Sequence, residues 1–377
     1  MSRSIIDIHI LQTVPPSNLN RDDTGSPKTA VYGGERRSRV SSQAWKRATR
    51  ESFKPALDPS EYGMRTKRVV EVLGERIAAL SPDLAEKSND YAKQAINMAG
   101  IKTKLQDKKD TLEEAGYLVF LSEVQLNALA EAAVRAAAED DFGAAIKAMN
   151  LKSIANHAHS VDIALFGRMV ADLPELNVDA AAQVAHAISV HAVQTEYDYF
   201  TAVDDRKAAD DDEDAGAAMI GTVEFNSATL YRYATVDVDR LSDNLGNAAA
   251  TERAVQAFIR AFVTSMPTGK QNTFANRTLP DAVLVTLGGS QSVNLVGAFE
   301  DALPNTGSSS RVGTAARRLA EHAGQVHAAY GTSPDRSWVV AIGAAADALD
   351  GVGPTIPLDQ LVDELGSEVG RRLAESA

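Results

Sequence analysis

The stretch from Ala30 to Lys54 reads A-V-Y-G-G-E-R-R-S-R-V-S-S-Q-A-W-K-R-A-T-R-E-S-F-K. Two glycines lead into a basic run, and the serine pair Ser41 and Ser42 follows it. A serine hydroxyl can accept the unpaired backbone N–H groups of a first helical turn, so this pair predicts a helix N-terminus. We expect the helix that follows to carry cations on one face and to pack Trp45 inward.

The cations after the serines recur every four residues. Lys46, Arg50 and Lys54 therefore fall on one predicted helix face, with Gln43 and Arg47 beside them. The positive end of the helix dipole and the free N–H groups of the first turn lie at the same place. The basic run adds three more cations, which are Arg36, Arg37 and Arg39. Together these features predict a phosphate-binding site.

Charge is distributed unevenly along the chain. Residues 28–54 contain eight Lys or Arg and two acids, a net charge of +6, whereas the whole chain carries −13 and the remainder therefore −19. An acidic protein that concentrates positive charge at one helix start is expected to bind phosphates. The alternative interpretation is a solvated basic helix without a ligand.

Composition excludes several classes of protein. The chain has 377 residues, 44% of them hydrophobic, which is enough for a buried core and two or three domains or lobes. It has no cysteine, so disulfides, thiolate nucleophiles and cysteine-ligated zinc are excluded. No apolar run approaches the ~20 residues that span a bilayer, and the N-terminus lacks the pattern of a signal peptide. We expect a cytoplasmic protein.

The hydrophobic pattern predicts both strands and helices in the first half of the chain. Residues 5–11 alternate as a half-buried strand does. Residues 55–180 are rich in alanine and show helical spacing without a strand signal, and Ser122 followed by Gln125 matches a capping box. Residues 178–194 are predicted to be a helix.

A β-hairpin is predicted next. Residues 197–203 and 219–225 are its strands, and the segment between them contains the run D-D-R-K-A-A-D-D-D-E-D at 204–214. Strand-like residues continue over 230–236. Aromatic side chains, Tyr197, Tyr199 and Phe200, lie at the base of this hairpin.

The last third is predicted to combine one strand with several helices. An amphipathic helix is predicted over 255–266, a polar loop over 267–281, a strand over 282–287 and a helix over 293–303. Further helices are predicted after the Gly/Ser break at 305–310. Strand–helix–strand units interrupted by a helical block predict a mixed α/β fold with a discontinuous main domain.

No catalytic or metal site is predicted. T-G-K at 268–270 lacks the first glycine of a P-loop, and Gln271 replaces the Ser or Thr that follows. The acids of 204–214 could hold Mg²⁺ for phosphodiester cleavage, although such runs more often keep a loop soluble. Two histidine pairs have a spacing of five, which places them on different helix faces: His186 with His191, and His322 with His327.

Several motifs in order resemble the CasC family, the backbone subunits of the type I-E CRISPR surveillance complex Cascade. The match extends over about 1–290 and is weak in the last 80 residues. The strongest strings are N-L-N-R-D-D at 18–23, V-Y-G-G-E-R-R-S-R-V-S-S-Q-A-W-K-R-A-T-R at 31–50, V-D-I-A-L-F-G-R-M at 161–169, A-H-A-I-S-V-H at 185–191 and D-Y-F-T-A-V-D-D at 198–205. E-F-N-S-A-T-L-Y-R-Y-A at 224–234 and N-L-G at 244–246 are looser matches.

The resemblance implies a right-hand-shaped fold. Its palm is a modified RRM or ferredoxin-like domain without the standard RRM string. Helical fingers are inserted over 59–181, and a thumb hairpin over 193–229. The palm then consists of 1–58, 182–192 and 230–377, the last part including the C-terminal helices.

The resemblance also implies the binding residues. The implied contacts with the guide RNA are Lys28, Ser41, Ser42, Gln43, Lys46, Arg50 and Met169, and Arg21 and Lys270 are further candidates. The implied thumb residues, which wedge into the guide–target duplex, are Tyr199, Phe200, Val203 and Ile220. No metal or cofactor is expected.

The function that the resemblance implies is a non-catalytic one in antiviral defence. Head-to-tail copies would hold the crRNA in segments for pairing with target DNA, beside the large, small, guide-end-capping and guide-processing subunits. Two alternatives stay open: a metal-dependent nuclease that uses the 204–214 acids, and an oligomeric anion-binding protein.

Overall fold

The computed structural model of the chain describes residues 3–107, 111–170, 172–202, 219–304 and 310–376. Val203 and the acids of 204–214 lie outside the described residues. The chain forms two compact units, and each is discontinuous in sequence. Unit 1 comprises 1–51, 184–235 and 258–365, and unit 2 comprises 52–183, 236–257 and 366–377. The predicted mixed α/β class is confirmed.

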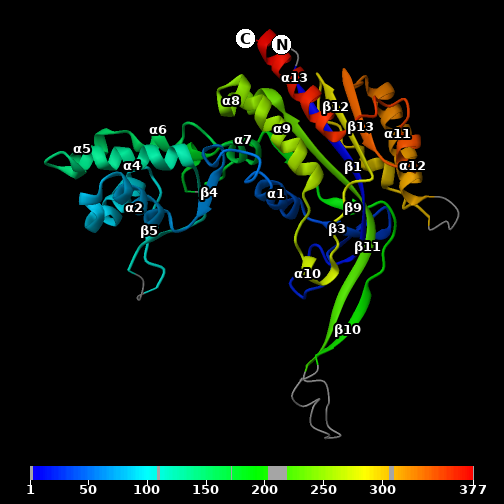
Figure 1. Ribbon diagram of the computed structural model, residues 1–377, viewed down its shortest axis with the longest axis horizontal. Helices are drawn as coiled ribbons and strands as arrows, with labels where there is room; N and C mark the ends of the chain where they lie inside the picture. The colour runs from blue at the N-terminus through cyan, green and yellow to red at the C-terminus, as the bar shows by residue number, and fades with distance from the viewer. Residues whose placement is uncertain (1–2, 108–110, 171, 203–218, 305–309, 377) are drawn as a thin grey trace, which may run out of the picture. The chain divides into compact units, whose positions relative to one another are not determined.

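A large antiparallel sheet forms the centre of unit 1 (Figure 1). Its strands follow the order β13-β12-β1-β11-β9-β3-β2, and β10 and β8 also pair with β11. The bounds are β1 (Ile5–Ser17), β2 (Thr29–Tyr32), β3 (Glu35–Val40), β8 (Ala182–Val184), β9 (Ala187–Ser189), β10 (Glu196–Ala202), β11 (Met219–Asp237), β12 (Ala282–Gly288) and β13 (Arg336–Ala341).

Helices cover both faces of this sheet. One face packs against α11 (Arg311–Tyr330), α12 (Ala344–Ala348) and the 3₁₀ helix η5 (Leu295–Phe299), through a shared hydrophobic core. The other face carries α1 (Ser42–Glu51) and the second half of α9 (Ala248–Thr264). Figure 1 shows α11 and α1 on opposite sides of β1.

The prediction of a half-buried first strand was wrong. The side chains of Ile6, Ile8 and Ile10 are buried, as expected, but so are Asp7, His9 and Leu11 on the opposite side of the strand. Because helices cover both faces of the sheet, β1 has no solvent face. Its polar residues find partners instead: Asp7 accepts a hydrogen bond from the Tyr233 hydroxyl, and His9 bonds to Tyr231.

The predicted helix over 178–194 was also wrong. This segment contains β8 and β9, and its backbone groups pair across the sheet rather than within a helical turn. Ala185 N–H donates to Tyr233 O, and Val190 N–H donates to Thr229 O. The neighbouring strands come from distant sequence, so local helical spacing could not reveal this pairing.

The region after residue 290 holds less helix and more strand than expected. Only η5 forms within the predicted helix 293–303. The strand β13 lies in a region predicted to be helical, and it pairs with β12 through Trp338 opposite Val285. The predicted strand at 282–287 and the predicted helix α9 are confirmed. The described part of the last third also contains α10 (Gln271–Phe274), which lies in the predicted polar loop, and α13 (Leu358–Ser376).

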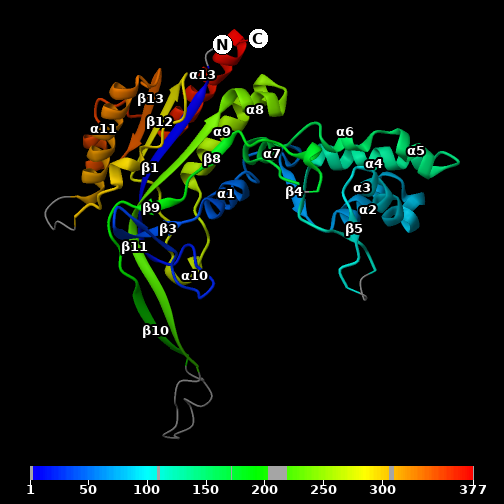
Figure 2. The same cartoon turned by 180° about the vertical axis from the view of Figure 1, so that it is seen from behind.

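Unit 2 is mainly helical (Figure 2). Its core lies between α2, α3 and α4, where Leu73, Ile96 and Leu129 are fully buried. The capping box is confirmed, since Ser122 Oγ accepts the Gln125 N–H and Gln125 Oε1 accepts the Ser122 N–H. The helices lying wholly in this unit are α2 (Val69–Leu80), α3 (Ser88–Met98), α4 (Glu123–Ala137), α5 (Phe142–Ala148), α6 (Leu151–Ala155), α7 (Val161–Phe166), α8 (Val238–Leu245) and the 3₁₀ helices η1 (Pro59–Glu61), η2 (Pro82–Lys87) and η3 (Pro174–Leu176).

Unit 2 also contains strands that the sequence did not predict. β4 (Gly63–Thr66) pairs with β7 (Val119–Ser122), and β5 (Thr103–Lys104) pairs with β6 (Glu114–Ala115). The expectation that no strand interrupts the mostly helical region 55–180 was therefore wrong. These strands are four and two residues long. A strand this short leaves almost no alternation to detect.

Candidate nucleic-acid interface

The glycine pair and the basic run form a β-hairpin rather than a loop before the helix. Gly33 and Gly34 connect β2 to β3 with φ of +60° and +78°, as a two-residue type I′ turn requires. A Cβ atom on Gly33 would lie 1.7 Å from the Glu300 carbonyl oxygen. Only glycine therefore fits where this turn packs against the end of η5.

The three arginines of this run have different environments. Arg37 is buried and donates to the carbonyl oxygens of Ser189 at 2.9 Å, Phe299 at 3.0 Å and Glu300 at 2.8 Å. Its predicted role as one of the cations around the phosphate site is therefore wrong. Arg39 donates to Thr29 O and lies 3.2 Å from His186 Nδ1. Arg36 is exposed to solvent.

The predicted helix N-terminus is confirmed. Ser41 Oγ accepts the Ala44 N–H at 3.2 Å, and α1 begins at Ser42. Ser41 is itself fixed, because its N–H donates to Asn20 Oδ1 at 2.9 Å. The cap thus joins the helix to the loop that precedes β2.

The two faces of α1 differ as predicted. Trp45 and Thr49 are buried, whereas Gln43 is exposed and Lys46 is half-buried, which lowers the pKa of its ammonium group through desolvation. Arg50 lies in the last turn of the helix. The helix ends at Glu51, so Lys54 does not share this face, contrary to the prediction.

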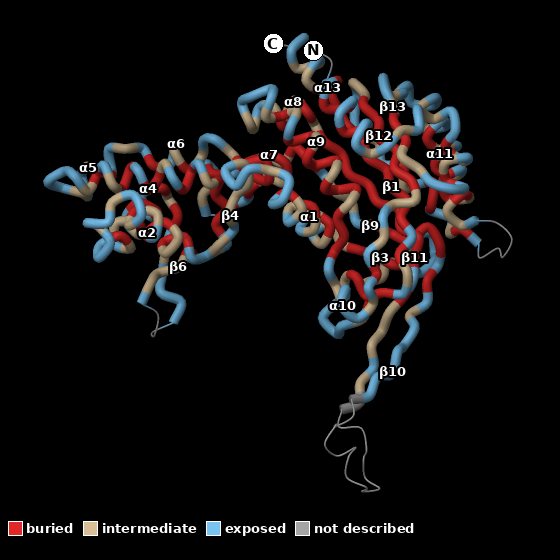
Figure 3. Tube along the Cα trace, in the orientation of Figure 1, coloured by how far each residue is buried: buried red, intermediate tan, exposed pale blue. Residues whose placement is uncertain are grey.

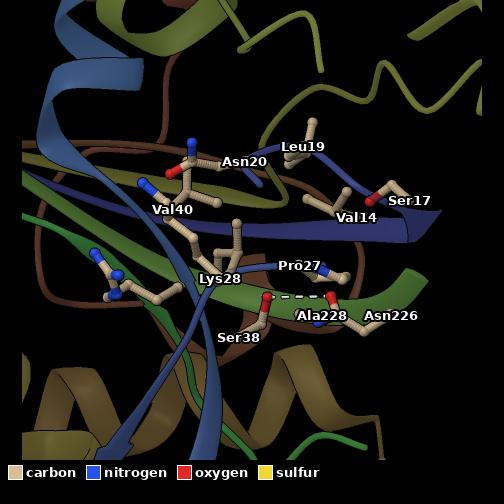
Figure 4. Close-up of a pocket in the computed structure, with 12 residues that line it drawn as sticks. Val14, Ser17, Leu19, Asn20, Pro27, Lys28, Ser38, Val40, Asn226 and Ala228 are labelled. Atoms are coloured by element: carbon tan, nitrogen blue, oxygen red, sulfur yellow. Dashed lines mark hydrogen bonds between the residues drawn. The ribbon is translucent and has the colours of Figure 1, made fainter. Parts of the chain in front are cut away.

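Lys28 and Arg21 lie on the loop that leads into β2. Lys28 N–H donates to Asn20 O, and Lys28 O accepts the Arg39 N–H, both at 2.9 Å. Lys28 also borders a small cavity with Asn20 and Ser38 (Figure 4). Arg21 is exposed beside the bridge that it forms with Pro27.

Lys270 approaches this loop from the second half of the chain. It lies before α10 with φ of +50° and is partly exposed. The preceding Gly269 packs so tightly that a Cβ atom would lie 2.2 Å from Leu19 O. Unit 1 therefore gathers the loop of Lys28, the start of α1 and the segment of Lys270 around residues 19–20.

Asn20 is the member of this site that the sequence interpretation missed. It accepts from Ser41 through its side chain and from Lys28 through its carbonyl. Asn20 lies in the N-L-N-R-D-D motif, which pointed to this segment in the sequence. Its contacts with Ser41 and Lys28, however, depend on the fold.

Met169 lies in unit 2, at a bend held by its neighbours. Gly167 ends α7 with φ of +76°, and a Cβ atom there would lie 2.8 Å from Val178 O. Arg168 points inward and donates to Leu176 O, Phe120 O and Asn156 Oδ1. Met169 is 85% exposed and lines a groove of about 600 Å³ that Arg65 and Leu118 also line.

The strand β10 is coloured as exposed in Figure 3, and its aromatic side chains are exposed to solvent. Tyr199 is 63% exposed and Phe200 38%, and adjacent strand residues point to opposite faces. Phe200 covers Gly221 directly across the hairpin, where an added Cβ atom would lie 2.4 Å from the ring. Ile220 pairs with Thr201 in the strand register. Val203 lies outside the described residues.

The histidines of this region have structural partners. Thr229 N–H donates to His191 Nε2, which leaves Nδ1 as the donor to Ala192 O, and burial lowers the pKa of His191. His186 and His191 belong to the β8–β9 segment and do not share a helix. Within the described ranges, no cluster of three His, Asp or Glu side chains is arranged to hold a metal ion.

Comparison with known proteins identifies the family. The sequence profile described as CT1975-like protein matches residues 6–364, nearly the whole chain. The chain belongs to the CT1975-like family. This family is CasC-like, and the solved structures described next are chains of CRISPR surveillance complexes, so the predicted resemblance is confirmed.

Two solved structures have the same fold as this CT1975-like protein. A chain of a "CRISPR RNA-guided surveillance complex, pre-nicking" is 33% identical, with a TM-score of 0.84, and the match covers 97% of this chain and 100% of that one. A chain of a "CRISPR RNA-guided surveillance complex" is 29% identical, with a TM-score of 0.72 and coverage of 96% and 99%.

Two further searches gave negative results. No curated protein matches the sequence. No described helix is both long and apolar enough to cross a bilayer.

Proposed function

We propose that this CT1975-like protein is a non-catalytic, crRNA-binding backbone subunit of a type I-E complex. Copies would lie head-to-tail along the guide and hold its spacer in segments for pairing with target DNA. Base pairing would then read the target sequence, while the protein holds the phosphate backbone.

The arrangement around α1 carries this proposal. A capped helix start, the half-buried Lys46 and the adjoining Lys28 and Lys270 segments lie on one part of unit 1. Helix N-termini and cations bind phosphate without reading bases. Since Trp45 anchors the opposite side of α1, this face is presented in a fixed orientation.

The β10–β11 hairpin supports the second part of the proposal. It exposes Tyr199 on one face and Phe200 on the other. A blade with an aromatic side chain on each face can separate two neighbouring base steps and stack on both. We therefore assign the interruption of the guide–target duplex to this hairpin.

Purification tests the RNA-binding part directly. The protein should co-purify with RNA that is visible on a denaturing gel, and adding Mg²⁺ to the purified protein should leave that RNA intact. Absence of nucleic acid would favour the anion-binding alternative. Mg²⁺-dependent cleavage would favour the nuclease.

A further inference from the structure

Beneath the proposed phosphate-binding helix lies a buried arginine that this function does not use. Arg232 comes from β11, its side chain is almost fully buried, and its guanidinium carbon lies 3.7 Å from the centre of the Trp45 ring. The same carbon lies 4.7 Å from the centre of the Phe262 ring of α9. The guanidinium therefore contacts two aromatic rings.

The hydrogen bonds of Arg232 go only to neutral acceptors. It donates to Gln12 Oε1 at 2.6 Å and to the Phe262 carbonyl oxygen. Within the described residues no carboxylate forms an ion pair with it, and burial alone lowers its pKa to about 9. At neutral pH a positive charge without a counter-ion thus lies directly under α1.

Trp45, the partner of Arg232 in this contact, has no side-chain hydrogen bond among the described residues that would fix its position. Its indole N–H makes no hydrogen bond to any described residue, although the ring is fully buried. The ring is therefore held by packing alone, and the Arg232 guanidinium is one of the groups that pack on it. A desolvated guanidinium over a tryptophan ring is among the stronger cation–π contacts.

We infer that Arg232 is a positioning residue for guide binding: by stacking on Trp45 it sets the orientation of α1 and of the side chains that α1 presents. This inference rests on the proposed function. Lysine in its place would keep the charge but lose the planar stack and the forked hydrogen bonds. The geometry of the stack is then the property under test.

The experiment uses the full chain with Trp338→Phe, which leaves Trp45 as the sole tryptophan. Arg232→Lys should change the emission spectrum of Trp45 and weaken binding of a labelled single-stranded RNA by about tenfold. Arg37→Lys is the matched control, because Arg37 is equally buried and also donates to carbonyl oxygens, while its described ring contact is with Tyr32. It should leave the Trp45 emission unchanged.

Each outcome decides the inference. Unchanged emission in Arg232→Lys, or changed emission with unchanged RNA affinity, would overturn it. If Arg232→Lys does not fold, Trp45→Phe and Trp45→Leu take its place. Trp45→Phe should then weaken RNA binding, and Trp45→Leu should weaken it further. Trp45→Leu that binds RNA like the parent would also overturn the inference. A parent protein that binds no RNA contradicts the proposed function instead, while the emission spectra still report the stack.

Discussion

The helix α1 and the hairpin of β10 and β11 belong to the same unit but are supported in opposite ways. Behind α1 lies a buried layer in which Arg232 contacts both Trp45 and Gln12. The strand β10 has no such layer, and residues 196–201 are all exposed. Holding a phosphate backbone requires donors in fixed positions, whereas separating base steps requires a thin blade that reaches away from the sheet. The difference in burial matches the difference in task.

The largest expected effect comes from the face of α1. Lys46→Ala with Arg50→Ala should weaken RNA binding by about a hundredfold or more, because each charged hydrogen bond contributes roughly 1.5–3 kcal/mol. The dependence of affinity on salt should become shallower by about 0.7 per lost phosphate contact on single strands. Titrations of several unrelated RNAs at a series of salt concentrations measure both. A loss restricted to one RNA sequence would show that α1 does not hold the backbone.

The hairpin should respond differently. Tyr199→Ala and Phe200→Ala should preserve binding of guide RNA, and each should weaken target-DNA pairing by about tenfold, the lower end of aromatic stacking on a base. Because the two rings lie on opposite faces, their effects should add in the double variant.

Affinities for a full set of singly mismatched target DNAs give the readout. Guide positions under the hairpin should lose their tolerance of mismatches in the variants. An unchanged periodic pattern would remove both residues from the wedge role.

Acid should lower the stability of the central sheet, to which β11 belongs. Burial lowers the pKa of His9 to about 3, so the folded protein keeps His9 neutral while the unfolded chain binds a proton below about 6.5. The stability that neutral His9 contributes to the folded protein is therefore complete above pH 6.5, and it is lost as the pH falls toward 3.

From pH 7 to pH 5 this one group should reduce the free energy of unfolding by about 2 kcal/mol. Burial raises the pKa of Asp7. Above about pH 3.8 this shift acts in the opposite direction, because it makes the folded protein more stable as the pH falls. Urea unfolding of wild type and His9→Gln separates the two. An equal pH slope in both proteins would contradict the assignment to His9.

The smallest expected effect concerns the acids between β10 and β11. Removing Asp210–Asp214 should leave guide affinity unchanged, because acidic side chains repel phosphate and are poor guide contacts. The nuclease alternative makes a contrary prediction: if the 210–214 acids hold the Mg²⁺, the same deletion should abolish an Mg²⁺-dependent cleavage.

Local signals were sufficient where one segment makes its own structure. The Ser41 cap, the capping box at Ser122 and the inward face of α1 follow from side chains that bond within a few residues. They failed where partners are distant, as in β8, β9 and β13, because a strand's stability comes from its neighbours. For the same reason Asn20 was missed, since its partner Ser41 is 21 residues away.

What the sequence determined by itself is the presence of a capped basic helix, an aromatic hairpin and a family-specific order of motifs. The tertiary structure alone decided which cations remain at the surface. Arg36, Arg37 and Arg39 are almost adjacent, yet Arg37 is buried because Ser189, 152 residues away, and the end of η5 supply its acceptors. Arg232 lies in the loosely matching motif at 224–234, but no local pattern predicts its contact with Trp45, because that residue comes from another element. Burial depends on what packs above a residue, and that is a property of the whole fold.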